Sequence, residues 1–234
     1  MEKNKIWLFI AIIAIIGFVA VSCGDDNGDT HTHNYVWTVT STTYPAQSTG
    51  TCSCGETSSS RNTAIGDTGQ GGGKIFYIAE AGFTVTGDVP FTAHYLEVAA
   101  VSQGSIPWSG TNVNVSGITN VRVIGEGKKN TAAIIAAHTA DTAVNNAAVA
   151  AAAYRGGGKD DWFLPSQDEL IELRDANRVP NTASDTVLGI PRTGSLWSST
   201  QASETNAFAA SFGGGGVSPT GKSTSQTVRA VRAF

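Results

Sequence analysis

Ten residues in the second half of the chain combine a short apolar segment with the start of a helix: Asp161-Trp162-Phe163-Leu164-Pro165-Ser166-Gln167-Asp168-Glu169-Leu170. Ser166 and Glu169 have the spacing of a capping box, in which each side chain accepts a hydrogen bond from the other residue's backbone N–H. Asp168 and Glu169 also suit the positive end of a helix dipole. We therefore interpret both carboxylates as helix-capping groups, with Leu170 and Leu173 facing the core.

Strands are predicted on both sides of this helix. Residues 196–199 and 207–212 look like neighbouring strands, and residues 228–234 form a terminal strand that must be paired to stay ordered. Trp162 and Trp197 are expected to fill the core and to donate hydrogen bonds from their indole N–H groups.

The part of the domain that precedes these strands begins at Gly66. Residues 74–79, after a triple glycine, and residues 95–99 are predicted strands. Residues 131–155 contain 12 alanines in 25 positions, which predicts a helix that is broken near 139–142 and stops at Gly156. Its small side chains favour close packing of two helices on a sheet.

The order of the sequence blocks resembles that of one bacterial family. The blocks are Ile65-Gly66-Asp67-Thr68-Gly69, Ile75-Phe76-Tyr77, Tyr95-Leu96-Glu97-Val98-Ala99, Trp108, Gly125-Glu126-Gly127-Lys128 with Asn130-Thr131, Asp161 to Ser166, Trp197-Ser198-Ser199-Thr200, and Val228-Arg229-Ala230-Val231-Arg232. Residues 66–234 resemble the Lcl C-terminal-type domain of envelope lipoproteins and collagen-like adhesins. The family's functions are largely unknown.

This resemblance implies an α+β fold of the C-type-lectin-like and formylglycine-generating-enzyme-like kind. Such a fold has two or three helices beside a small, twisted, mostly antiparallel sheet, with its amino and carboxyl ends paired and long loops on one side. Family members often carry a cysteine in the Ala-rich region. None occurs here, so no disulfide is transferred from the resemblance.

The first 22 residues are predicted to be a lipoprotein signal peptide. Lys3 and Lys5 precede 16 apolar residues, 6–21, a run too short to span a bilayer comfortably. Residues 20–23, Ala-Val-Ser-Cys, resemble the bacterial lipobox. The resemblance implies lipidation of Cys23 and an extracytoplasmic position in the cell envelope, with the inner or outer membrane left undecided.

Residues 23–34 are polar and are predicted to form a flexible tether, followed by a small Thr/Ser/Cys-containing β module over residues 35–65. His31, His33, Cys52 and Cys54 could supply four soft donors to zinc, but C-x-C is tighter than the usual spacing of zinc ligands. We therefore predict no metal here, and favour a Cys52–Cys54 disulfide or two free thiols.

Composition and context argue against nucleic-acid and nucleotide partners. The chain has 234 residues, of which 15% are charged, and a net charge of −4, which disfavours binding to phosphate backbones. Residues 216–223 match G-x-x-x-x-G-K-[ST], but a phosphate-binding loop needs a helix at that point, whereas residues 224–234 are strand-like. We predict a Gly-rich hairpin with a solvated Lys222.

No catalytic residue is predicted. Formylglycine-generating enzymes use a late cysteine pair, and no cysteine follows Cys54. A Ser-His-Asp arrangement could use only His94 or His138, without a G-x-S-x-G elbow. Asp160 and Asp161 follow a glycine-rich turn and could bind calcium, or one could cap the turn while the other orients the next strand.

Ligand binding is the predicted function. Trp108 lies in a turn-rich segment, where an exposed indole could stack on a sugar or anchor a protein. With Asp160 and Asp161 it forms the candidate ligand-binding set, presented by loops 101–120, 181–195 and 213–222. We predict a lipid-anchored, non-catalytic binding or adhesion protein with a glycan, protein or matrix ligand. The alternatives are an envelope enzyme or enzyme accessory and a purely structural lipoprotein.

Overall fold

A computed structural model describes residues 22–24, 30–41, 43–138, 146–178 and 186–234. The predicted signal peptide up to residue 21 and the helix break predicted near 139–142 lie outside the described residues. Within the described ranges, none of the helices combines the length and apolar character needed to cross a membrane.

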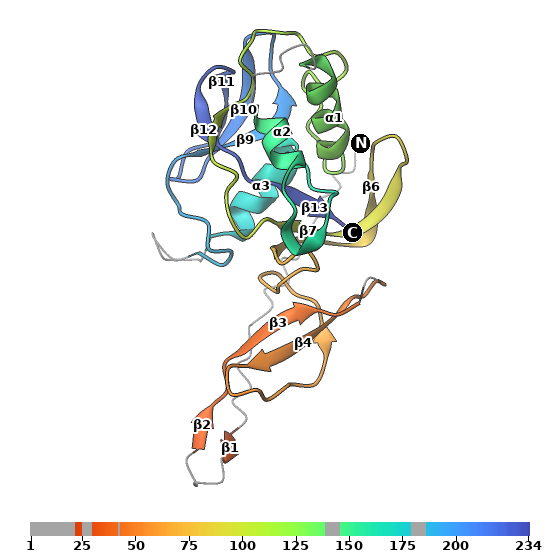
Figure 1. Ribbon diagram of the computed structural model, residues 1–234, viewed down its shortest axis with the longest axis vertical. Coiled ribbons are helices and arrows are strands. Elements are labelled where there is room, and N and C mark those ends of the chain that lie inside the picture. Colours follow the sequence, from red (N-terminus) through yellow and green to blue (C-terminus); the bar gives the residue numbers. More distant parts are fainter. Residues whose placement is uncertain (1–21, 25–29, 42, 139–145, 179–185) are drawn as a thin grey trace, which may run out of the picture.

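The larger part of the chain is an α+β domain built on two antiparallel-rich sheets (Figure 1). One sheet has the order β11-β10-β9-β12-β8, in which only the β9–β12 pairing is parallel. Its strands are β8 (Ser105–Pro107), β9 (Ser195–Gln201), β10 (Asn206–Ser211), β11 (Val217–Gly221) and β12 (Ser225–Thr227). The adjacent pairing of β9 and β10 confirms the neighbouring strands predicted from the sequence.

The second sheet has the order β13-β7-β6 and contains the last strand of the chain. Its strands are β6 (Lys74–Val85), β7 (Phe91–Val98) and β13 (Val231–Ala233). Strand β13 is held by β7 on one side and by a bridge from Phe163 to Val231 on the other, so the terminal strand is paired as predicted. The first and last strands of this sheet both pair with β7 rather than with each other.

Three α-helices cover the sheets: α1 (Gly127–Ala137), α2 (Ala147–Ala152) and α3 (Gln167–Ala176). Helix α1 begins four residues before the predicted Ala-rich helix. Helix α2 ends before the predicted stop at Gly156, where a 3-10 turn, η1 (Gly156–Gly158), follows. Between α2 and η1, Tyr154 packs edge-on against Trp162 with ring centres 4.9 Å apart.

The capping box at the start of α3 is present as predicted. The Ser166 hydroxyl accepts from the Glu169 N–H at 3.3 Å, and a Glu169 carboxylate oxygen accepts from the Ser166 N–H at 2.7 Å. Leu170 and Leu173 are fully buried. The local pattern of Ser, Glu and leucine therefore fixes both where the helix starts and which face it buries.

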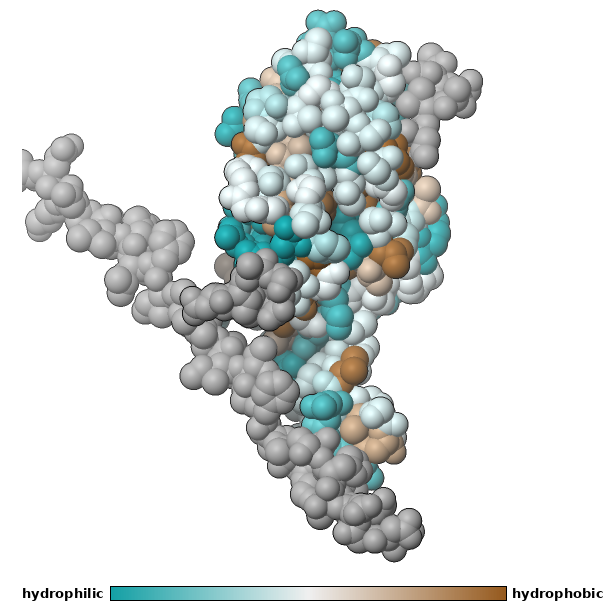
Figure 2. All heavy atoms as spheres, turned by 90° about the vertical axis from the view of Figure 1, so that its left-hand side faces the viewer, coloured by the Kyte–Doolittle hydropathy of each residue, from teal (hydrophilic) through white to brown (hydrophobic). Residues whose placement is uncertain are grey.

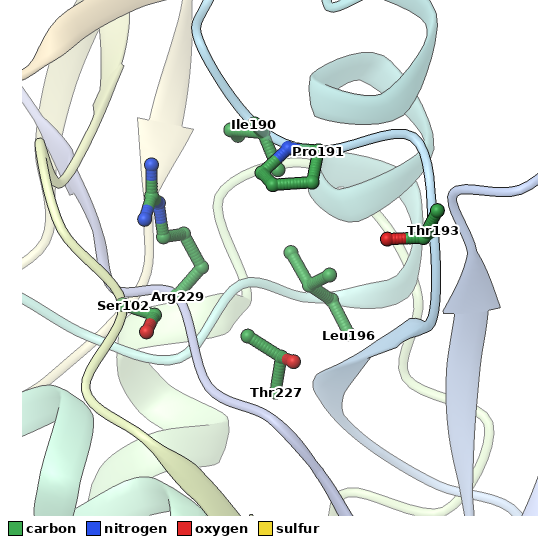
Figure 3. A pocket seen from close by; sticks show the side chains of 7 residues that line it. All are labelled: Ser102, Ile190, Pro191, Thr193, Leu196, Thr227 and Arg229. Carbon is green, nitrogen blue, oxygen red and sulfur yellow. The ribbon is translucent and has the colours of Figure 1, made fainter. Parts of the chain in front are cut away.

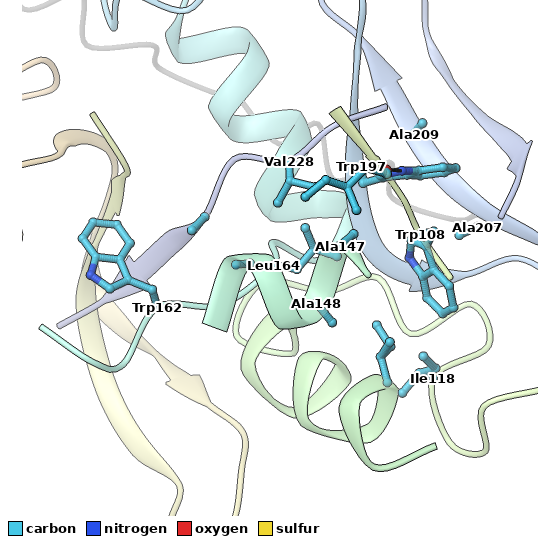
Figure 4. Packing of buried hydrophobic residues seen from close by; sticks show 14 of the residues in the cluster. Trp108, Ile118, Ala147, Ala148, Trp162, Leu164, Trp197, Ala207, Ala209 and Val228 are labelled. Atoms are coloured by element: carbon cyan, nitrogen blue, oxygen red, sulfur yellow. Dashed lines mark hydrogen bonds between the residues drawn. The ribbon is translucent and has the colours of Figure 1, made fainter. Parts of the chain in front are cut away.

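Two apolar clusters fill the domain. One contains three tryptophans with the alanines of α2 and β10 (Figure 4), and the other contains Phe76, Leu96, Leu170 and their neighbours. Trp162 Nε1 donates to Gly156 O at 3.3 Å, and Trp197 Nε1 donates to Ile106 O at 2.9 Å. Both indoles therefore occupy the core with satisfied N–H groups, as predicted.

A smaller β module extends from one end of this domain (Figure 1). It consists of β3 (Tyr35–Val39), β4 (Gln47–Cys52) and β5 (Arg61–Asn62) in that order. Its buried apolar cluster joins Val39 and Ala46 to Ile75 and Tyr95 of the larger domain. The Ala46 N–H also donates to the Tyr95 hydroxyl at 2.9 Å, so the module depends on the domain for its core.

The segment before the module also contains backbone pairing. Strands β1 (Ser22–Gly24) and β2 (Thr30–Thr32) run antiparallel, and Cys23 is opposite His31. His33 is buried, with 4% of its surface exposed. His33 therefore belongs to the module rather than to the predicted tether, whereas the flexibility of the tether stays a prediction.

Candidate functional site

Trp108 is part of the core. Its exposed fraction is 0%, and its Nε1 donates to Ser198 O at 2.8 Å. The segment that carries it pairs with the five-stranded sheet, because β8 is antiparallel to β12. The expected exposure of Trp108 is therefore wrong: edge pairing of β8 turns the indole inward, where it cannot stack on a ligand.

Lys222 is also buried, which contradicts the expectation of a solvated side chain. Its Nζ donates to Val113 O at 2.7 Å and to Gln201 Oε1 at 2.6 Å, and it lies 4.6 Å from the ring centre of Trp108. Burial lowers the pKa of Lys222 to about 8, partly opposed by the charge of Glu204. Lys222 is therefore a core residue, and its contact with Val113 O joins it to loop 111–115.

The phosphate-loop motif that contains Lys222 has the strand setting predicted from the sequence. Strand β11 ends at Gly221 and β12 begins at Ser225, so a tight turn rather than a helix follows the lysine. A helix N-terminus is the part of such a loop that supplies backbone N–H groups to phosphate. Here a turn between β11 and β12, two strands that do not pair with each other, takes the place of that helix. Together with the engaged Nζ, this turn argues against nucleotide binding.

Asp160 and Asp161 have different surroundings. Asp160 is exposed, whereas Asp161 Oδ1 accepts from Arg232 Nε at 2.5 Å. Arg232 Nη1 also binds Glu97 Oε1 at 2.9 Å, and Glu97 is fully buried. Asp161 therefore helps to hold a buried arginine. Calcium binding at this pair stays a prediction that would have to compete with that ion pair.

The triple glycine before β6 shapes the pocket for Glu97. The Gly71 N–H donates to Glu97 Oε1 at 2.9 Å, and a Cβ on Gly71 would lie 2.8 Å from the same oxygen. Only glycine allows the backbone to come this close to the carboxylate. Burial raises the pKa of Glu97, and the Arg232 guanidinium opposes that rise.

Glu169 is the buried carboxyl whose pKa lies nearest neutrality. Burial raises its pKa to about 7, against the opposing effect of N–H groups from Ser166 and Gly125. One oxygen accepts from Gly125 N at 2.8 Å and the other from Ser166 N at 2.7 Å. Both oxygens are thus held by the backbone in a fully buried position, which fits capping rather than proton exchange with a substrate.

The two histidines considered for catalysis are held by backbone carbonyls. His94 Nδ1 lies 2.9 Å from Ala79 O, and His138 Nδ1 lies 2.8 Å from Ile134 O. In a Ser-His-Asp triad this nitrogen faces the aspartate that orients the ring. Neither histidine therefore has the arrangement that the catalytic alternative requires.

A surface hollow of about 320 Å³ lies where the second half of the domain meets the turn after β7 (Figure 3). Arg229 forms one side, and Pro191, Leu196 and Thr193 face it. Its seven lining residues, Ser102, Ile190, Pro191, Thr193, Leu196, Thr227 and Arg229, combine three hydroxyls and an apolar wall with a single charge, which is positive.

Arg229 has hydrogen-bonding capacity that its protein neighbours do not use. Only 8% of its surface is exposed, and Nη2 donates to Ala100 O at 3.2 Å. Its Nε is buried and has no hydrogen-bond acceptor among the described residues. Burial lowers the pKa of Arg229, although the guanidinium stays charged at neutral pH. From the sequence alone, Arg229 was predicted only to be part of a terminal strand; its position between the apolar residues Val228 and Ala230 was the available signal.

A second candidate site lies at the end of the module that is remote from the large domain. Cys54 Sγ is 3.2 Å from His33 Nδ1, and the ligand atoms of His33, Cys52 and Cys54 all lie within 4.8 Å of one another. The two sulfurs are not joined. The structure thus brings together three of the four residues named for zinc, whereas the side chain of His31 lies outside the described residues.

The two thiols differ in acidity. Hydrogen bonds from the Cys54 backbone N–H and thiol lower the pKa of Cys52 to about 6, and His33 adds to this effect. The same thiol contact raises the pKa of Cys54. The shared contact thus favours the thiolate on Cys52 over that on Cys54, and the thiolate is the form that binds metals and reacts with oxidants.

Comparisons with known proteins identify the larger domain. The Lcl C-terminal domain family matches residues 104–232, more than half of the chain. Among solved structures, the chain is similar to a fimbrial protein from Bacteroides ovatus, with 13% sequence identity and a TM-score of 0.49. That likeness covers 81% of this chain and 57% of the fimbrial protein, so the chain spans little more than half of that protein's length. No curated protein matches the chain.

Proposed function

Because this chain belongs to the Lcl C-terminal domain family, we propose that it is a lipid-anchored protein of the bacterial cell envelope that binds an acidic ligand and catalyses no reaction. Cys23 carries the lipid, and the hollow beside Arg229 receives the ligand. The scaffold is of the C-type-lectin-like kind, in which loops at one side of a small sheet make the binding surface. Nucleotides and nucleic acids are not among its partners.

The hollow at Arg229 is the observation that carries the binding proposal. A guanidinium offers planar N–H groups that match a carboxylate, and Arg229 is the charged residue that lines the hollow. The hydroxyls of Ser102, Thr193 and Thr227 add donors and acceptors suited to a sugar or a peptide backbone. We therefore propose a carboxylate-bearing glycan as the ligand, with an acidic peptide segment as the competing outcome.

The character of the surface favours a polar ligand. Figure 2 shows hydrophobic residues scattered over the visible face rather than gathered into one patch. Protein docking surfaces of the apolar kind need a contiguous patch of several hundred Å². A small polar hollow with one cation is better suited to recognition of a charged group.

The absence of catalysis is supported by how the titratable groups are used. Glu97, Glu169 and Lys222 are buried and bound to protein partners, and none of them lines the hollow. An active site needs convergent groups that reach a substrate. The seven lining residues of the hollow include neither a carboxylate nor a histidine.

Binding can be tested with uronic-acid oligosaccharides, their neutral counterparts and acidic peptides, presented to the full chain. We expect retention of the uronic-acid probes alone, weakened by salt, and loss of most binding in Arg229→Gln. Thr193→Val removes a hydroxyl from the exposed rim and is expected to weaken binding without loss of stability. Arg155→Gln, at an exposed arginine outside the hollow, is the matched control. Equal binding by wild type and Arg229→Gln would refute the site.

Anchoring can be tested separately with Cys23→Ala. We expect the variant to keep its leader and to take up no labelled fatty acid, since lipidation precedes cleavage at a lipobox. Ser22→Thr, which alters the neighbouring position but keeps the cysteine, is expected to be labelled and processed as wild type is. Unchanged labelling and processing of Cys23→Ala would overturn the anchor.

A further inference from the structure

We propose that His33, Cys52 and Cys54 form a zinc-binding site at the membrane-proximal end of the β module. The inference rests on the geometry of these three side chains and is independent of the ligand proposed for the hollow. It assigns a function to a cluster that the binding proposal leaves unused.

The distances fit a metal with little rearrangement. In a tetrahedral zinc site with bonds of about 2.0–2.3 Å, ligand atoms lie roughly 3.5–3.8 Å apart. Here the His33 Nδ1–Cys54 Sγ distance is 3.2 Å, and the whole set spans at most 4.8 Å. Shifts of about 1 Å or less would place all three atoms at bonding distance from one ion.

The local backbone explains why the three residues meet. Cys52 ends β4 opposite Tyr35, and the turn that follows is closed by the Cys52 N–H donating to Glu56 O at 2.8 Å and the Gly55 N–H donating to Cys52 O at 2.9 Å. Gly55 has a φ of 92°, which glycine adopts without strain. This turn returns Cys54 toward His33, two residues before the start of β3.

His33 is positioned by packing as well. Its ring stacks on Tyr35 with centres 5.5 Å apart, and the Tyr35 side chain lies against Gly50, where a Cβ would be only 2.9 Å away. A side chain at position 50 would displace the tyrosine and the imidazole with it. The donor set is therefore held by the fold rather than assembled from free loops.

The chemistry of the donors selects the ion. Two thiols and an imidazole are soft and borderline ligands, which favour zinc over calcium or magnesium. Cys54 is exposed, so one side of the site is open to water or to a further ligand. Three protein ligands with an open position describe a zinc site that exchanges its fourth ligand. His31, two residues before His33, is the residue best placed in sequence to complete it.

Zinc at this position would cross-link the end of the module that lies farthest from its buried apolar cluster. The apolar cluster of the module lies at the other end of the ribbon, against Ile75 and Tyr95. The ion would join His33, two residues before β3, to Cys52 at the end of β4 and to Cys54 in the turn that follows, closing a loop of about twenty residues. Small units without a sufficient core commonly use such a staple.

The experiment measures zinc bound by the full chain, expressed with its leader, purified in detergent under a thiol-free reductant and titrated against a chromogenic chelator. We expect one zinc ion per chain. Cys54→Ser changes only an exposed residue, so it should fold, and we expect it to lose more than the roughly 10- to 100-fold in affinity that removal of a supporting group costs. Ser53→Ala, between the two cysteines, is the matched control and should bind as wild type does.

Cobalt provides a second readout that reports the ligands themselves. We expect a thiolate-to-cobalt charge-transfer band in wild type, a weaker band in Cys54→Ser and a shifted d–d spectrum in His33→Gln. Wild-type zinc content no higher than that of a Cys52→Ser, Cys54→Ser double variant would overturn the site. A loss of two mass units in protein isolated without reductant would assign a Cys52–Cys54 disulfide instead, and would equally overturn it.

Discussion

The large domain and the β module differ in what stabilises them: the domain has a core of its own, whereas the module shares its core with the domain. The domain contains two apolar clusters, and two of its buried charged side chains have partners within it: Glu97 pairs with Arg232, and Lys222 donates to Gln201. The module shares its one apolar cluster with the domain. At its remote end it has a group of metal-binding side chains instead of a core.

The difference follows from size. A unit of about 30 residues buries too little surface to offset its conformational entropy, so it needs a neighbour, a metal or a disulfide. A domain of this size can bury charged side chains, provided that each finds a partner. Substitutions in the domain should therefore act on global unfolding, whereas those in the module should act locally.

The largest effect is expected for Arg232→Ala. It removes the cation that faces fully buried Glu97, and breaking a buried pair in this way costs about 3–5 kcal/mol of unfolding free energy. Chemical denaturation measures the loss. The double variant Glu97→Leu, Arg232→Met should recover part of it, since the carboxylate that still loses its partner, Asp161, has a side chain that is 34% exposed. A loss below about 1 kcal/mol for Arg232→Ala would contradict the view that this pair is essential to the domain.

Lys222→Ala is expected to cost about 2–4 kcal/mol, because it leaves a cavity beside Trp108 and removes the donor to Val113 O and Gln201 Oε1. The melting temperature reports the change. Lys129→Ala, at a lysine whose side chain is 51% exposed, serves as the control. If both variants melt alike, Lys222 is solvated as the sequence had predicted.

Glu169→Gln tests the buried cap through pH. The folded pKa of about 7 exceeds the unfolded value of 4.5, so the native state binds the proton more tightly. The stabilisation that the folded state gains by binding a proton at Glu169 is complete below about pH 4.5 and is lost as the pH rises through 7. We expect the glutamine variant to lose about 1–3 kcal/mol at pH 5, where one N–H is left without an acceptor, and less at pH 8. A wild-type fall in melting temperature between pH 5 and 8 that equals that of the variant would refute the assignment.

The smallest effect is expected for Val39→Ala, at about 1 kcal/mol, and only within the module. Val39 is 5% exposed and belongs to the cluster shared with Ile75 and Tyr95. Hydrogen exchange should quicken in β3 and β4 while the amides of β9 and β10 keep their protection. Val36→Ala, at a position 60% exposed, should change neither. Faster exchange throughout both regions would show that they unfold as one unit.

The parts of the fold that were predictable depend on neighbours in sequence. Ser166 and Glu169 are three residues apart, so their capping box could be recognised directly. The strand pair β9–β10 and the paired terminal strand also follow from short apolar segments. The family resemblance supplied the domain that the match over residues 104–232 then confirmed.

The site residues whose surroundings could not be predicted from the sequence depend on distant partners. Trp108 is buried because β8 joins β12 and its indole reaches Ser198, 90 positions away. Lys222 binds Val113, 109 positions away. His33 meets Cys54 across 21 positions, through a turn that the C-x-C spacing alone does not reveal. Local periodicity carries no information about such contacts.

The pairing of β1 with β2 has a consequence for how far the protein stands from the membrane. Cys23 is opposite His31, so the chain returns to the level of the residue proposed to carry the lipid. Ten fully extended residues could separate the anchor from the β module by roughly 35 Å. Antiparallel pairing of β1 with β2 brings the two ends of this segment together and so removes most of that separation. If Cys23 carries the proposed lipid, the length of the β module sets the distance between the membrane and the hollow at Arg229. That distance then limits which molecules on the cell surface the hollow can contact.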